Sequence, residues 1–424
     1  MTTNTKDLRQ QVMAARAASR ELARTSTAVK DQALANIARE LTAREKELVE
    51  ANRLDYEEGK GTGLSETLLD RLLLTPERLR DLSRDVLRIA GLPDPVGETF
   101  DMRTMPNGLQ IGKRRVPLGV IGAVYESRPN VTIDISALCL KSGNAVVLRG
   151  GKEAIRSNLA LARLVKDSVA EAGAPREAVQ FVESTDRALV EEMLHMRGLI
   201  DLLIPRGGDE FIRYVAETAT IPVVTGGIGV CHTYVDRTAD MDNAVAIAYN
   251  AKVQRPSVCN ALDTLLVHSE IATRYLPQIG RAWGEAGVEM RCDQRAFEIL
   301  QEVNGARVVR AKDSDWGREF LSLVASVRVV DGIQEAMSHI ETHGSGHSEA
   351  IITEDYSLAN TFLEQVDAAA VFVNASTRFT DGGQFGLGAE VGISTQKMHA
   401  RGPMGLKELT SYKWIILGKG HVRP

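Results

Sequence analysis

Cysteine is scarce in this chain, and the cysteines that occur are widely spaced. Four are found among 424 residues, at Cys139, Cys231, Cys259 and Cys292. No two of them form a CxxC pair or another closely spaced set, so the pattern indicates neither a disulfide framework nor a cysteine zinc site. We therefore expect the protein to work in a reducing compartment.

Long apolar runs and an excess of basic charge are also missing. Residues 1–7 lack the apolar run of a secretory signal peptide, and nowhere do about eighteen apolar residues follow one another, as a membrane span requires. The net charge is −5, which argues against a surface that binds nucleic acid, while 44% hydrophobic residues argue against disorder. We expect a cytoplasmic, globular protein that binds neither membrane nor nucleic acid.

The length and the spacing of apolar residues predict an α/β protein of two or three domains, because 424 residues exceed what one core usually supports. The first ninety residues have helical spacing of apolar side chains. From residue 117 onward, short apolar runs alternate with helical segments, which predicts a parallel sheet. Its strands are predicted at residues 119–124, 144–148, 179–182, 200–204 and 221–224, and a second α/β segment at about 233–373.

Two standard nucleotide-binding motifs are absent, since no GxGxxG follows a predicted strand and no GxxxxGK[ST] occurs. Two predicted strands are instead followed by glycine beside basic residues, in residues 148–152 and 204–209. Backbone amides and a helix N-terminus in such turns can bind a phosphate. An ordinary βα turn with a solvated basic side chain would have the same sequence.

Cys259 stands between a loop with basic residues and the apolar run 262–267. A cysteine becomes a nucleophile when its pKa falls below about 8.5, and the nearby Lys252, Arg255 and backbone amides could lower it. Taken alone, the pattern favours a half-buried structural thiol at the start of a strand, because free cysteine usually packs as a small hydrophobic residue.

The segment 343–349 contains two histidines four residues apart. This spacing occurs in helical zinc sites, but Gly344 and Gly346 would each cost about 1 kcal/mol in a helix, and no acid follows His343 as HExxH requires. We expect no metal here. A loop after a helix at 333–340 would offer hydrogen-bond donors to a carboxylate-bearing ligand, and a histidine-rich surface turn is the alternative.

Three segments together carry a family resemblance. They are residues 125–132 (YESRPNVT), 250–260 (NAKVQRPSVCN) and 339–351 (HIETHGSGHSEAI). The chain resembles, over essentially its whole length, the γ-glutamyl phosphate reductases, also called glutamate-5-semialdehyde dehydrogenases, of the aldehyde dehydrogenase superfamily. One departure is Met337, where the family usually has a branched aliphatic residue, but the change conserves volume.

The resemblance implies an aldehyde dehydrogenase-like α/β fold. Residues 1–101 and 118–228 would form a discontinuous, Rossmann-type NADPH-binding domain, and residues 229–375 a catalytic α/β domain with Cys259 as the nucleophile. Two further parts are implied: a β-hairpin oligomerisation flap, residues 102–117 and 400–424, and a connecting segment, residues 376–399. A turn at 105–109 with an extended arm at 110–116 is consistent with such a flap, and we expect a homodimer or larger homo-oligomer.

The reaction implied is the NADPH-dependent reduction of L-glutamyl 5-phosphate to L-glutamate 5-semialdehyde in proline biosynthesis. Cys259 would attack the acyl phosphate, expel phosphate and form a thioester that hydride from NADPH reduces. The Cys259 amide and the Asn130 side chain are expected to hold the oxyanion. Because the acyl phosphate is labile, a transient contact with glutamate 5-kinase is a further hypothesis.

The resemblance also assigns binding residues. The cationic turns favour NADPH over NADH. Residues expected to bind the cofactor are Arg149, Lys152, Arg206 and Gly207 at its adenosine end and Glu319 at the nicotinamide ribose. Residues expected to bind the substrate are Arg255, Glu126, Ser345 and His347.

The alternative is a hydrolytic aldehyde dehydrogenase that acts on another short aldehyde. Such enzymes place a water-activating glutamate just after the last strand of the cofactor domain. The corresponding residues 224–230 contain no acid, and a reductase that starts from an acyl phosphate has no use for one. The sequence therefore favours an enzyme whose thioester is exchanged with phosphate rather than hydrolysed by water.

Overall fold

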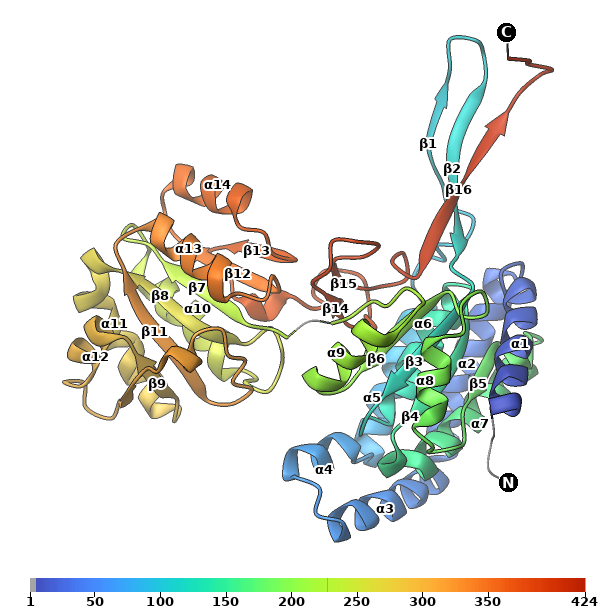
Figure 1. The fold of residues 1–424 in the computed structure, drawn as a ribbon, viewed down its shortest axis with the longest axis horizontal. Coiled ribbons are helices and arrows are strands. Elements are labelled where there is room, and N and C mark those ends of the chain that lie inside the picture. Colours follow the sequence, from blue (N-terminus) through green and yellow to red (C-terminus); the bar gives the residue numbers. More distant parts are fainter. Residues whose placement is uncertain (1–4, 227, 424) are drawn as a thin grey trace. The chain divides into compact units, whose positions relative to one another are not determined.

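The computed structural model describes residues 5–226 and 228–423, which pack into two compact units (Figure 1). Unit 1 is Met1–Gly226 with Gly386–Gly392 and Met404–Pro424. Unit 2 is Gly227–Phe385 with Ile393–Pro403. Among the described residues, no helix has the length and apolar character needed to cross a membrane.

Unit 1 contains a four-stranded parallel sheet in the order β5-β4-β3-β6. The two central strands are buried along their whole length, as expected for an apolar run with helices on both sides. The strands are β3 (Val120–Tyr125), β4 (Ala145–Gly150), β5 (Val179–Phe181) and β6 (Leu202–Arg206). The helices that follow them are α6 (Asn130–Lys141), α7 (Ile155–Glu171), α8 (Ala188–Leu194) and α9 (Asp209–Thr218), with short 3-10 turns at Lys152–Ala154 and Arg176–Ala178.

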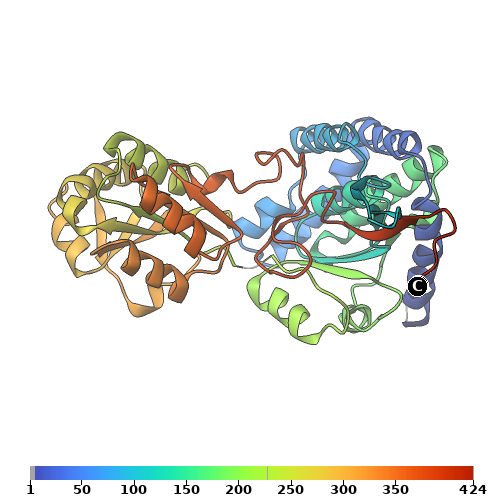
Figure 2. The same cartoon turned by 90° about the horizontal axis from the view of Figure 1, so that it is seen from above.

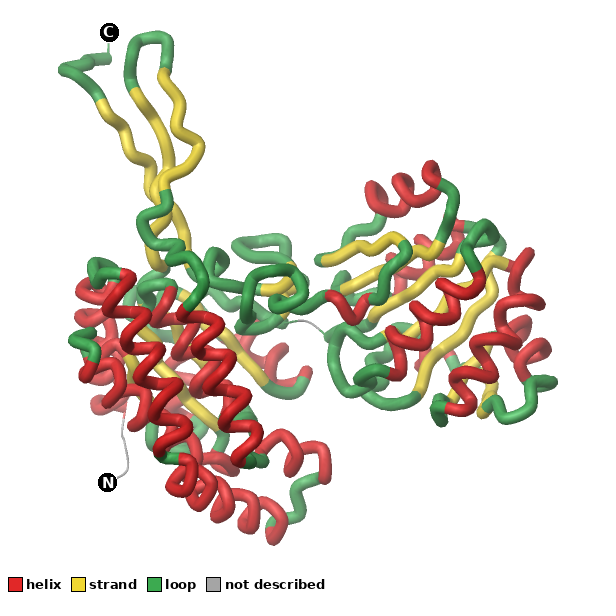
Figure 3. The backbone as a smooth tube through the Cα atoms, turned by 180° about the vertical axis from the view of Figure 1, so that it is seen from behind, coloured by secondary structure: helices red, strands yellow, loops and turns green. Residues whose placement is uncertain are grey.

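The N-terminal helical region consists of five helices (Figure 3). The first packs on the strands of this sheet, and the second, third and fifth pack against α6 or α7. They are α1 (Thr5–Leu22), α2 (Thr27–Ala43), α3 (Glu45–Gly61), α4 (Glu66–Leu72) and α5 (Pro76–Ala90). The helical prediction is confirmed, but hydroxyl side chains divide it. Ser26, Ser65 and Thr75 each accept a hydrogen bond from the amide three residues later and start a new helix.

The strand predicted at residues 221–224 is wrong. Val223 forms only an isolated bridge with Leu203, although the Val224 amide still donates to the Leu203 carbonyl (2.9 Å). Pro222 has no amide hydrogen, so the segment cannot form a full ladder. Gly227, which follows, lies outside the described residues.

A three-stranded antiparallel sheet completes unit 1, in the order β1-β2-β16. β1 (Thr99–Thr104) and β2 (Gln110–Pro117) are joined by the predicted turn, in which Gly108 has φ +89°. β16 (Thr410–Leu417) pairs with β2 along its whole length, from Thr410 opposite Pro117 to Leu417 opposite Gln110. The predicted hairpin is confirmed, and the chain's C-terminal strand supplies its third member.

Unit 2 contains a seven-stranded sheet, all parallel, in the order β10-β9-β11-β8-β7-β12-β13. Its strands are β7 (Cys231–Val235), β8 (Leu262–His268), β9 (Glu289–Cys292), β10 (Arg307–Arg310), β11 (Val324–Val330), β12 (Ser348–Ile352) and β13 (Ala370–Val373). Its helices are α10 (Met241–Val253), α11 (Ser269–Glu285), α12 (Gln294–Leu300), α13 (Ile333–His343) and α14 (Tyr356–Gln365). Two short strands, β14 (Ile393–Ser394) and β15 (Gly402–Pro403), pair with each other.

Each face of the seven-stranded sheet has its own apolar core, with helices on both sides (Figure 2). Leu265 and Val267 of β8 belong to the core under α10, α11 and α12, whereas Leu266 belongs to the core under α13 and α14. Adjacent side chains of a strand point to opposite faces, so β8 is apolar on both sides. The loop that carries Cys259 leads directly into this strand.

Candidate functional site

Cys259 lies in the loop between α10 and β8, and its side chain is half-buried. Gly229 packs directly against its backbone. A Cβ atom at position 229 would lie 1.8 Å from the Cys259 carbonyl oxygen and 2.7 Å from its Cα. Position 229 therefore requires glycine, because any other side chain would displace the backbone of the cysteine.

The next residue, Asn260, anchors the other side of this loop. Its buried amide nitrogen Nδ2 donates to the carbonyl of Thr380 (2.8 Å) and to that of Arg378 (3.4 Å). In return, the Thr377 hydroxyl donates to the Asn260 carbonyl (2.8 Å). The Cys259 backbone is thus held between the segment at Gly229 and the 3-10 turn Thr377–Phe379.

A buried network lies beneath the Cys259 backbone. The Cys231 thiol donates to the Cys259 carbonyl (3.2 Å) and lies 3.8 Å from His347 Nδ1, which is 2.9 Å from the Ser348 hydroxyl. Burial raises the pKa of the Cys231 thiol well above its usual range and lowers the pKa of His347 to about 4. Both groups are therefore neutral at pH 7, so Cys231 supports the loop as a hydrogen-bond donor.

His347 is one of the four residues predicted to bind substrate, and its side chain is completely buried in this network. Its Nε2 has no hydrogen-bond partner among the described residues. The predicted loop begins later than expected, because α13 continues through His343, with Gly344 as its C-cap. A role for His347 in substrate binding stays a prediction.

Ser345 and Glu319 both hold the segment that packs on Cys259. The Ser345 hydroxyl accepts a hydrogen bond from the Val230 amide (2.9 Å), and a Glu319 carboxylate oxygen accepts one from the Gly229 amide (3.1 Å). Unit 2 thereby brings Ser345, Glu319 and Cys259 together. These contacts were not predictable from the sequence, since they join residues 90 and 115 positions apart.

The two cations near Cys259 in sequence differ in their surroundings. Lys252 is fully buried, and its Nζ donates to the Leu262 carbonyl (2.8 Å) and lies 3.6 Å from Asp263 Oδ1. Lys252 therefore fastens the start of β8. Arg255 is exposed, and its charge acts on Arg378, whose pKa is lowered first by burial and then by Arg255. Sequence reasoning missed Arg378 altogether.

In unit 1, the carboxyl end of β4 carries a cation, Arg149, that is only partly hydrogen-bonded. Arg149 is 8% exposed, and one terminal nitrogen of its guanidinium donates a hydrogen bond to the Thr185 carbonyl (3.0 Å). Its buried Nε has no hydrogen-bond partner among the described residues. Burial lowers the pKa of this guanidinium. Lys152, in the next turn, is exposed. A buried, partly unpaired guanidinium at the carboxyl edge of a parallel sheet fits a phosphate-bearing cofactor.

The turn after β6 contacts the loop after β3. The Glu126 amide donates to the Arg206 carbonyl (3.0 Å), and the Gly208 amide donates to Glu126 Oε2 (3.3 Å). A Cβ atom on Gly207 would lie 2.6 Å from that carboxylate oxygen. Glu126, predicted to bind substrate, is thus next to two residues predicted to bind the cofactor.

Asn130 is the first residue of α6, in unit 1. Its Nδ2 donates to Asp134 Oδ2 (2.9 Å), and burial raises the pKa of Asp134 to about 7. Its predicted contact with the oxyanion stays a prediction. Among the described residues, no group of three or more histidine, cysteine or acidic side chains is arranged to hold a metal ion.

The packing of Gly229 leads to a stability prediction. Gly229→Ala should lower the free energy of unfolding by about 1–3 kcal/mol, because the added methyl group must push the Cys259 backbone aside. Urea denaturation measures the change. The control is Gly61→Ala at the end of α3, where no atom lies within 4 Å of the added methyl. Equal stability of Gly229→Ala and the unmodified chain would contradict this packing.

Comparisons with known proteins place the chain in a family. Residues 1–295 match the model of the aldehyde dehydrogenase family. The chain is 59% identical over 417 residues to a γ-glutamyl phosphate reductase of Dehalococcoides mccartyi, and 98% of each chain is covered. It is 54% identical over 413 residues to the enzyme of that name from Roseiflexus castenholzii, covering 96% of this chain and 97% of the relative.

A solved structure gives the same answer. The crystal structure of γ-glutamyl phosphate reductase from Thermotoga maritima superposes with a TM-score of 0.95 at 46% identity, covering 98% of this chain and all of that one. The predicted aldehyde dehydrogenase-like fold is thereby confirmed. The chain belongs to the aldehyde dehydrogenase family and, within it, to the γ-glutamyl phosphate reductases.

Proposed function

We propose that the chain reduces L-glutamyl 5-phosphate to L-glutamate 5-semialdehyde with NADPH, releases phosphate, and acts in proline biosynthesis through a thioester on Cys259. The observation that carries this proposal is a half-buried cysteine whose backbone is held on two sides, in a chain 59% identical to a γ-glutamyl phosphate reductase. A fixed backbone keeps the sulfur in position for attack.

The reaction proceeds in two stages at the sulfur. The Cys259 thiolate attacks the acyl carbon, and the carbon–oxygen bond to phosphate breaks with its electron pair on phosphate. After reduction of the thioester, the carbon–sulfur bond breaks and the thiolate returns. The Cys259 amide and Asn130 stabilise the oxyanion in both stages, a contribution of about 3 kcal/mol for each donor.

The family implies a nicotinamide cofactor, which supplies the hydride when it is bound. We assign NADPH to residues 1–101 and 118–228, with Glu319 of unit 2 at the nicotinamide ribose. The unpaired Nε of Arg149 supports binding of an anionic group, and a 2′-phosphate would satisfy it. Lys152, Arg206 and Gly207 complete this set.

The hydrolytic alternative finds less support. The acid that contacts the segment at Gly229 is Glu319, which we assign to the cofactor. We assign the thioester chemistry to residues 229–375 and a connecting role to residues 376–399. Ser345 and Arg255 lie in the same unit as Cys259, and we propose both, with His347 and Glu126, as substrate-binding residues.

Assembly through the flap is a separate part of the proposal. The flap consists of residues 102–117 and 400–424. Within it, one face of β16 carries a stripe of exposed apolar side chains, formed by Tyr412, Trp414 and Ile416, which are 47%, 50% and 55% exposed. Such a stripe on an edge strand is typical of an interface, and a second copy of the chain would cover it. We propose a cytoplasmic homodimer or larger homo-oligomer, with a transient contact to glutamate 5-kinase.

The thioester proposal predicts a phosphate requirement. The unmodified enzyme should form NADPH from NADP⁺ and pyrroline-5-carboxylate, the spontaneously cyclised form of L-glutamate 5-semialdehyde, only when inorganic phosphate is present, because phosphate must discharge the thioester. Cys259→Ala should abolish this activity. The absorbance of the NADPH formed measures the activity of both enzymes. Full activity without phosphate would favour the hydrolytic alternative. Activity of the Cys259→Ala enzyme would contradict a thioester on Cys259.

The flap proposal predicts a change of assembly. Ile416→Glu places a charge in the apolar stripe and should shift the enzyme to a smaller species, as measured by light scattering after gel filtration. Val422→Glu, outside β16 and 87% exposed, is the control and should leave the assembly unchanged. An unaltered mass for Ile416→Glu would show that this stripe is not an interface.

A further inference from the structure

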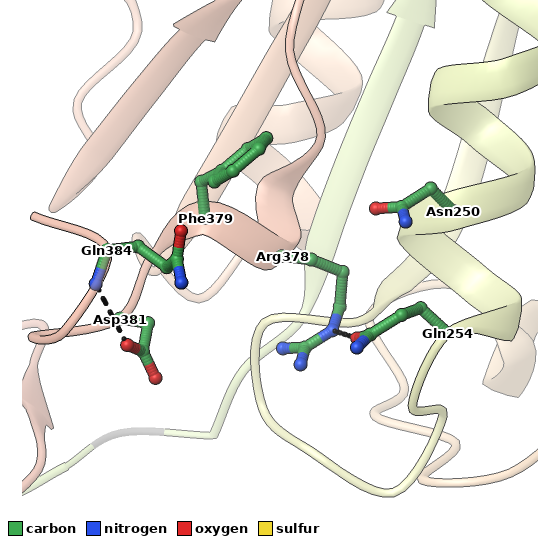
Figure 4. A pocket seen from close by; sticks show the side chains of 6 residues that line it. All are labelled: Asn250, Gln254, Arg378, Phe379, Asp381 and Gln384. Carbon is green, nitrogen blue, oxygen red and sulfur yellow. Dashed lines mark hydrogen bonds between the residues drawn. The ribbon is translucent and has the colours of Figure 1, made fainter.

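Unit 2 contains a cavity of about 260 Å³ that the proposed reaction has not yet used (Figure 4). The lining residues are Asn250, Gln254, Arg378, Phe379, Asp381 and Gln384. The lining combines one cation, one carboxylate and three side-chain amides. It is therefore polar and carries both signs of charge, unlike the largely apolar pockets that bind most small molecules.

This cavity is physically linked to the nucleophile. The turn that carries Arg378 is hydrogen-bonded to Asn260, the residue after Cys259, through the contacts of Thr377, Arg378 and Thr380. The charge of Cys259 also acts on Arg378, where it raises the pKa of the guanidinium against the lowering effect of burial. A substrate joined to the Cys259 sulfur would therefore have its remainder within reach of the cavity.

Arg378 is oriented for an anion. Its Nε donates to the Gln254 side-chain oxygen (2.8 Å), which fixes the plane of the guanidinium. In Figure 4 the terminal nitrogens project away from Gln254, to the side of the cavity where Asp381 and Gln384 lie. A half-buried guanidinium with a second cation, Arg255, nearby is stabilised by an anionic ligand.

Asp381 supplies the opposite charge at a fixed place. Its Oδ1 accepts hydrogen bonds from the amides of Gly383 (2.9 Å) and Gln384 (3.1 Å), which orient the carboxylate. Figure 4 shows it standing apart from the Arg378 guanidinium. Two separated, opposite charges match a zwitterion, whereas a phosphate dianion would be repelled by Asp381.

We propose that this cavity binds the α-amino-acid end of the substrate, with Arg378 on the α-carboxylate and Asp381 on the α-ammonium group. The inference rests on the proposed function and assigns the residues that hold the α-amino-acid end of its substrate. In an extended glutamyl chain the carbon of the α-carboxylate lies about 5 Å from the reacting carbonyl carbon, so the two ends of the substrate occupy different places. Arg378 and Asp381 are thus specificity-determining residues, and the amides of Asn250, Gln254 and Gln384 complete the lining.

The test measures binding of the amino-acid substrate and binding of phosphate independently. With NADP⁺ saturating, the KM for pyrroline-5-carboxylate and the KM for inorganic phosphate are measured for Arg378→Met, Asp381→Asn and the control Arg237→Met, an exposed arginine 3.7 Å from Glu270. Arg378→Met and Asp381→Asn should raise the KM for pyrroline-5-carboxylate about 10- to 100-fold and leave the KM for phosphate unchanged. Asp381→Asn conserves shape, so it tests the subsite even where Arg378→Met does not fold.

Two substrate analogues test which residue binds the α-ammonium group and which binds the α-carboxylate. For 5-oxopentanoate, which lacks the α-amino group, Asp381→Asn should have no effect, and for 4-aminobutanal, which lacks the carboxylate, Arg378→Met should have none. A raised KM for phosphate in Arg378→Met, or an unchanged KM for pyrroline-5-carboxylate in both variants, overturns the subsite alone. Absence of phosphate-dependent turnover by the unmodified enzyme overturns the proposed function and the subsite with it.

Discussion

The contact between Gly229 and the Cys259 backbone is the constraint on which the candidate site depends. No side chain fits at position 229, so the segment before β7 lies directly against the loop before β8. In the same segment, the Gly229 amide donates a hydrogen bond to Glu319 and the Val230 amide donates one to Ser345. A single glycine thereby joins four chain segments around the backbone of Cys259, and close packing keeps them in register.

Charge is distributed unevenly around this contact. Beneath the loop, burial keeps Cys231 and His347 neutral, and Lys252 contacts the Leu262 carbonyl and Asp263. Beside the loop, the charge of Cys259 acts on Arg378, and Arg255 adds a second positive charge that acts on Arg378. The interior supports the backbone with neutral hydrogen bonds, while the open side offers the cations that an anionic substrate and a thiolate require.

The sequence predicted those features that depend on neighbouring residues. The apolar runs located β3, β4, β6 and β8, and the turn at Gly108 located the hairpin, because strand and turn preferences act over a few residues. Contacts between distant segments were not predictable. The turn at Arg378 was assigned to a connecting segment, since its hydrogen bonds to Asn260 span 118 and 120 positions. The strand at 221–224 failed because Pro222 cannot donate a hydrogen bond.

The central claim is that Cys259 carries a glutamyl thioester that phosphate discharges. Rapid quenching followed by mass spectrometry of the peptides tests it directly, with enzyme, pyrroline-5-carboxylate and NADP⁺ mixed in the absence of phosphate. We expect one glutamyl group on the peptide that contains Cys259 and its disappearance when phosphate is added. A peptide that stays unmodified, or an adduct that water removes as fast as phosphate does, would contradict the account.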